Sequence, residues 1–97
     1  MADDRVNLLS NATATGSGLE WGGGAGTFCV VGTFSGATVA LQMLGPDATT
    51  WVTLNSGAAV SLTAAGALRF DAPPGQLRAS VASGSPSGLY ASVYRLP

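Results

Sequence analysis

The chain has 97 residues, no histidine and a formal net charge of −1, and only 9% of its residues are charged. A chain of this length forms one small domain, and its charged fraction is far below the roughly 25% of a typical soluble domain. Four basic residues against five acidic ones make no basic footprint, which argues against nucleic-acid binding. With so few charges, the chain is either a monomer whose surface is covered by Ser and Thr or, as we expect, a subunit with much of its surface covered in an assembly.

The first 25 residues are predicted to form an N-terminal arm and a flexible joint. Residues 6–14 read as an extended arm, residues 19–21 as a short candidate strand, and the glycine-rich residues 22–26 as the joint. The N-terminus has acidic residues where a secretory signal has basic ones, so we expect no signal peptide. No run of about 18 apolar residues is present, so we expect no membrane partner.

Residues 26–97 are predicted to form a β-sandwich domain. Apolar and polar residues alternate in runs such as TFCVVGTF (27–34), ATVALQML (37–44), QLRASVAS (76–83) and LYASVYRL (89–96). Turn signals rich in Gly, Pro, Asp and Ser separate these runs at intervals of about 8–12 residues, which is typical of all-β sandwiches and barrels. We therefore expect an all-β fold: one small antiparallel β-sandwich, or a partly closed barrel, of seven or eight short strands.

The residues that catalysis requires are largely missing. Serine or cysteine nucleophiles need a base such as histidine, and metal sites need clustered ligands, whereas the five carboxylates are scattered along the chain. Cys29 lies in a strand-like run and is interpreted as a buried structural thiol. The sequence predicts no catalytic residue, no cofactor, no metal and no small-molecule substrate, and hence no enzyme.

Two tryptophans stand next to chain breaks, and their roles stay open. Trp21 precedes the glycine-rich joint and Trp51 follows a turn. Each could fill an end of the core, which is the commonest role, contribute to a protein interface, or stack on a sugar ring. The last possibility supports an alternative function, a carbohydrate- or cell-surface-binding module that uses these tryptophans with Tyr90 and Tyr94.

Two segments, GTFSGATVALQMLGPDATTWVTL (32–54) and LTAAGALRFDAPPGQLRASVASGSPSGLYASV (62–93), resemble small virion proteins of tailed bacteriophages. The resemblance covers about residues 26–94, and Ala48 departs from it where glycine is common. It implies a β-sandwich on the phage particle, most commonly a capsid decoration or cement protein that is made in the bacterial cytoplasm and stabilises the shell. Parts of head fibres and of the tail, where a carbohydrate- or cell-surface-binding module would belong, are the alternative. The implied partners are the major capsid protein and further copies of the chain, for which we expect a homotrimer.

Large apolar or aromatic residues in the predicted arm, next to turns and in the last strand are the candidate interface. They are Val6, Leu8, Leu9, Trp21, Leu44, Trp51, Tyr90 and Tyr94.

Overall fold

The computed structural model describes residues 5–55 and 59–95, which form strands and loops and no helix. The strands are β1 (Arg5–Ala12), β2 (Leu19–Trp21), β3 (Gly24–Thr33), β4 (Thr38–Leu44), β5 (Trp51–Thr53), β6 (Ser61–Leu62), β7 (Gly66–Ala72), β8 (Gly75–Ala82) and β9 (Ser87–Arg95). The predicted all-β sandwich is confirmed, with nine strands because the very short β2 and β6 also pair. The described part has no helix of the length and hydrophobicity that a membrane crossing requires.

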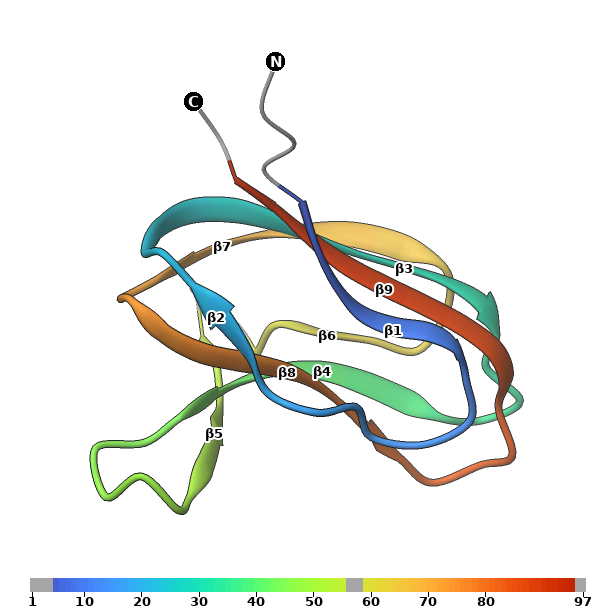
Figure 1. The fold of residues 1–97 in the computed structure, drawn as a ribbon. Coiled ribbons are helices and arrows are strands. Elements are labelled where there is room, and N and C mark those ends of the chain that lie inside the picture. The colour runs from blue at the N-terminus through green and yellow to red at the C-terminus, as the bar shows by residue number, and fades with distance from the viewer. Residues whose placement is uncertain (1–4, 56–58, 96–97) are drawn as a thin grey trace.

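Two antiparallel sheets face each other in the sandwich (Figure 1). Sheet A has the strand order β1-β9-β3-β7, and sheet B has the order β2-β8-β4-β5. The short strands β5 and β6 pair with the same side of β4, one after the other along it, and β8 pairs with the other side of β4. Each sheet therefore has one face toward the core and one face outward, as the alternating runs require.

The core lies between the inward faces and is built by the alternation of the strands. Phe28 and Val30 of β3, Leu41 of β4, Leu77 of β8 and Val93 of β9 are almost completely buried. Each such side chain contributes about 1.5–3 kcal/mol relative to exposure in water. No polar or charged residue of the described part is buried, so the core is entirely apolar.

Residues 5–12 differ from the predicted arm, because they form a strand of sheet A. β1 pairs with β9, and both Leu8 and Leu9 are only 5% exposed. The register shifts by one residue between Asn7 and Leu9, which is a β-bulge. A bulge sets two residues of one strand against one residue of the next. Two consecutive leucines can thus both point into the core, and strict alternation could not predict this.

The glycine-rich segment 22–26 differs from the predicted flexible joint, because it is a close-fitting corner between the sheets. The chain leaves β2 in sheet B and enters β3 in sheet A at the left of the view in Figure 1. A Cβ atom added to Gly23, which has a φ of +92°, would lie 2.8 Å from the Pro74 ring. A Cβ atom added to Gly26 would lie 2.8 Å from the Phe70 ring. Glycine is needed here because neighbouring groups approach the backbone closely.

Candidate functional site

The outer face of sheet A exposes three large side chains, which we call the tyrosine face: Val31, Tyr90 and Tyr94. Their exposed fractions are 47%, 49% and 41%. Val31 lies directly opposite Tyr90 across the β3–β9 ladder, and Tyr94 lies further along β9. An open groove of about 380 Å³ runs over this face, between these residues and β1.

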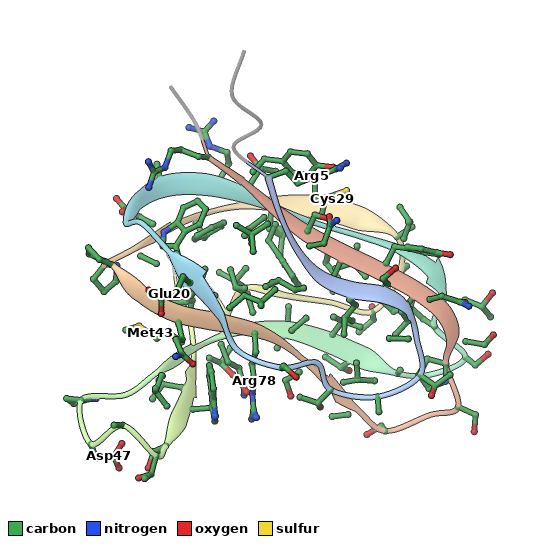
Figure 2. The ribbon with its side chains drawn as sticks, viewed as in Figure 1. Arg5, Glu20, Cys29, Met43, Asp47 and Arg78 are labelled. Carbon is green, nitrogen blue, oxygen red and sulfur yellow. The ribbon has the colours of Figure 1, made fainter. Side chains whose placement is uncertain are left out.

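Polar side chains from β1 and β9 form the rest of the groove. Asn7 and Ser92 are opposed in the ladder, and the Ser92 hydroxyl donates a 2.7 Å hydrogen bond to the Asn7 side-chain oxygen. Arg5 is opposite Tyr94 at one end of the groove. Figure 2 labels Arg5 together with Cys29 on this upper side of the molecule. The groove thus combines aromatic area with hydrogen-bonding groups, a composition that occurs at protein interfaces.

Cys29 is the one nucleophilic thiol in the sequence and lines the same groove. The prediction of a buried thiol was wrong, because Cys29 is half-buried on the outer face of β3; it is unpaired, and its neighbours across the strands are Ser92 and Ala67. The chain has no histidine that could act as a base for it. The groove therefore combines a thiol that has no histidine partner with the aromatic and hydrogen-bonding groups described above.

The outer face of sheet B carries a second group, which we call the Trp51 cluster: Trp51, Arg78, Gln42 and Thr53. The guanidinium carbon of Arg78 lies 4.5 Å from the centre of the indole ring of Trp51. Arg78 donates from Nε to the Gln42 side-chain oxygen at 2.9 Å, and Gln42 donates to the Thr53 hydroxyl at 3.3 Å. Trp51 is half-buried on this outer face and outside the core, so of the roles left open for Trp51 the core role does not apply.

The loop before Trp51 is held by the Asp47 carboxylate, at the lower left in Figure 2. Asp47 accepts hydrogen bonds from the backbone N–H groups of Thr49 and Thr50 and from the Thr50 hydroxyl. The hydroxyl and then the backbone N–H of Thr50, followed by that of Thr49, hold the pKa of Asp47 well below its usual range. Ala48 has a φ of +61°, the left-handed conformation that glycine adopts more readily.

Trp21 fills one end of the core. It is 3% exposed, and its ring centre lies 5.3 Å from that of Phe70 in a tilted arrangement. The guanidinium of Arg95 lies 5.5 Å from the Trp21 ring centre and donates to the Gly23 carbonyl oxygen. The indole N–H has no hydrogen-bond partner among the described residues. Trp21 is thus a core residue, and the surface interpretation does not apply to it.

The eight candidate interface residues separate into three groups. Val6, Leu8, Leu9 and Trp21 belong to the core or pack against it, Leu44 and Trp51 are neighbours on the outer face of sheet B, and Tyr90 and Tyr94 lie on the tyrosine face. The candidate list missed Val31 and Arg78. Alternation placed Val31 on the face opposite Phe28 and Val30, but only the pairing with β9 sets it beside Tyr90.

Among the residues that the structure describes, no three or more Cys, Asp or Glu side chains are grouped so that they could hold a metal ion. In comparisons with protein-family models, curated proteins and solved structures, no match to the chain was found. Function therefore has to be argued from the two outer faces and from the sequence resemblance alone.

Proposed function

We propose that this protein is a structural component of a tailed-phage particle, a decoration protein that binds the outer surface of the capsid and stabilises the shell. The resemblance of residues 26–94 to small phage virion proteins motivates the proposal. The low charge and the absence of histidine support a binding role in preference to catalysis. The partner is the major capsid protein, and the location is the virion.

The observation that carries the proposal is the tyrosine face. Aromatic side chains beside hydrogen-bonding groups on one exposed face are a composition that occurs at protein interfaces. Tyrosine is enriched at interfaces because its ring buries apolar area while its hydroxyl keeps a hydrogen-bond partner. Val31, Tyr90 and Tyr94 stand on three positions of two adjacent, central strands, so the surface that they form is rigid.

Binding through this face would stabilise the shell by mass action. A ligand that binds only the assembled form stabilises it by about 2.7 kcal/mol when its concentration is 100 times its dissociation constant. Many copies bound over one shell would add their contributions. In this role no bond has to form or break.

The test is co-sedimentation with capsid shells assembled from the major capsid protein of the phage that encodes this chain. We expect the wild-type chain to sediment with the shells and the Tyr90→Ser/Tyr94→Ser variant to stay in the supernatant. Val52→Ser is the matched control, because Val52 is 48% exposed but lies on β5 of the other sheet. Failure of the wild-type chain to sediment would refute the proposal, and equal binding by the double variant would refute the role of the tyrosine face.

One observation favours a second candidate function, the carbohydrate- or cell-surface-binding module. Trp51 is on an outer face, with the guanidinium of Arg78 over one side of its ring and with Gln42 hydrogen-bonded to Arg78. Aromatic rings next to fixed hydrogen-bonding groups are a suitable arrangement for a sugar. A glycan array with the wild-type chain and with Trp51→Ala tests this function, again with Val52→Ser as control. A glycan bound by the wild type and by Val52→Ser, but not by Trp51→Ala, would favour this candidate, and an array without any bound glycan would dismiss it.

A further inference from the structure

Strand β7 has an open edge at the side of sheet A. Its ladder with β3 runs without interruption from Gly66 to Ala72. Among the described residues, no backbone group of β7 forms a further hydrogen bond outside that ladder. Backbone N–H and C=O groups on the far side of β7 are therefore available to another strand.

The other sheet edges are protected against such pairing. β1, at the opposite edge of sheet A, has two register shifts, and bulges of this kind disrupt an edge. β2, β5 and β6, at the edges of sheet B, have only three, three and two residues. β7 has seven residues, no bulge and no inward-pointing charge. Proteins either protect a long, regular edge strand or use it to pair with another chain. Of the edges of the two sheets, β7 is therefore the one suited to pairing with another strand.

Two charged side chains define what can pair with β7. Arg69 and Asp71 are both exposed and lie two residues apart, on the outer face of the strand. Neither forms a hydrogen bond or an ion pair with any residue in the described part of the chain. Two like charges at these positions would repel a second copy of β7 and so protect the edge. Opposite charges attract instead, because two copies of β7 that run in opposite directions can set Arg69 of each against Asp71 of the other.

Geometry limits how two copies of β7 can meet. Directly opposed residues of an antiparallel ladder both direct their backbone groups toward the other strand or both away from it. Because this direction alternates along a strand, a two-fold axis can lie at a residue position but not between two residues. An axis at residue 69 sets Arg69 against Arg69, and an axis at residue 71 sets Asp71 against Asp71. An axis at Phe70 sets Arg69 of each copy against Asp71 of the other.

We propose that this protein forms a two-fold dimer by antiparallel pairing of β7 with β7 of a second copy, centred on Phe70. The two copies of sheet A then become one continuous eight-stranded sheet, with two Arg69–Asp71 pairs across the joint. The complementary charges of Arg69 and Asp71 identify a second copy of this chain as the partner that pairs with the edge. This contact is separate from the capsid-binding role of the tyrosine face, and it is a two-fold contact where the sequence suggested a trimer.

The test is sedimentation equilibrium of the full chain between about 1 and 300 µM. We expect the wild-type protein to reach the mass of two 9.6 kDa chains. Arg69→Asp and Asp71→Arg each turn both cross-strand pairs into like-charged pairs. Opposite charges directly across a ladder stabilise it by about 0.2–1 kcal/mol for each pair and like charges destabilise it by a similar amount, so reversing two pairs should weaken dimerisation of each variant by at least about fourfold.

An equimolar mixture of Arg69→Asp and Asp71→Arg provides the decisive measurement. In a mixed dimer, residues 69 and 71 of one chain are both acidic and those of the other are both basic, so both pairs are again complementary. We expect the mixture, and the double variant Arg69→Asp/Asp71→Arg, to dimerise about as well as the wild type. Glu20→Arg, an equal change of charge at an exposed position on β2, is the control and should leave dimerisation unchanged.

Three results would overturn the proposal. One is a wild-type chain that stays monomeric at 300 µM, and another is a trimer that neither reversal weakens. The third is a mixture that associates no better than the separate variants. Circular dichroism of each variant shows whether it is folded, and loss of capsid binding by the tyrosine variants would leave these results unaffected.

Discussion

Replacing Leu8 with alanine tests whether β1 is part of the core. Leu8 is 5% exposed and packs between the sheets next to the bulge with Leu9. Buried Leu→Ala changes cost about 2–5 kcal/mol, and we expect about 2.5 kcal/mol because β1 is an edge strand whose surroundings can partly relax. In a domain of this size, each kcal/mol lowers the melting temperature by about 4–8 °C. Leu8→Ala should therefore lower it by roughly 10–20 °C.

The measurement is thermal unfolding followed by circular dichroism, with Leu19→Ala as the matched control. Leu19 is 38% exposed on β2, and exposed substitutions usually change stability by less than about 0.5 kcal/mol. A melting temperature of Leu8→Ala within about 2 °C of that of Leu19→Ala would refute the argument, because it would mean that residues 5–12 are a detachable arm. Deletion of residues 1–14 gives the same contrast: loss of the folded state if β1 completes the core, and an unchanged melting curve if it is an arm.

Three further predictions concern turns and close approaches. Ala48→Gly should raise stability by about 0.5–1 kcal/mol in urea unfolding, because relief of the left-handed conformation exceeds the added entropy of the unfolded chain. Asp47→Asn should be less stable than the wild type at pH 5, and the difference in melting temperature should shrink at pH 2.5. The reason is that the folded-state pKa of Asp47 lies below its ordinary value near 3.9, so its contribution is present above that value and is lost as the pH falls toward the folded pKa. Gly26→Ala should cost about 1–3 kcal/mol in the same urea assay, because its Cβ would lie 2.7 Å from the Tyr94 carbonyl oxygen. An unchanged midpoint for Gly26→Ala, a destabilised Ala48→Gly, or a pH-independent Asp47→Asn difference would contradict the respective argument.

Much of the sandwich could be predicted from local patterns. The alternation in residues 76–83 sets Leu77 and Ala79 on one face, and the run at 89–96 does the same for Leu89, Ala91 and Val93; all five are buried in the structure. These assignments succeed because a strand with one buried face must alternate apolar and polar residues. They fail at Leu8 and Leu9, where the bulge in β1 breaks the alternation.

The candidate site was less accessible to sequence reasoning. Trp21 and Trp51 look alike in the sequence, since both stand beside a break in the chain, yet one fills the core and the other lies on an outer face with Arg78. The difference arises because β2 turns the side chain of Trp21 inward beside Phe70, while the pairing of β5 with β4 turns Trp51 outward beside Leu44. No local pattern contains either pairing.

By itself, the sequence determined the all-β class, the positions of most turns, and which residues share a face of a strand. It also determined that no histidine is present, since a residue type that is not in the chain cannot be supplied by folding. Only the tertiary structure decided which face meets the other sheet, which strands lie at the edges, and that Val31, Tyr90 and Tyr94 form one surface. The physical reason is that alternation acts between neighbours in the chain, whereas faces and edges depend on strand pairings between residues far apart in sequence.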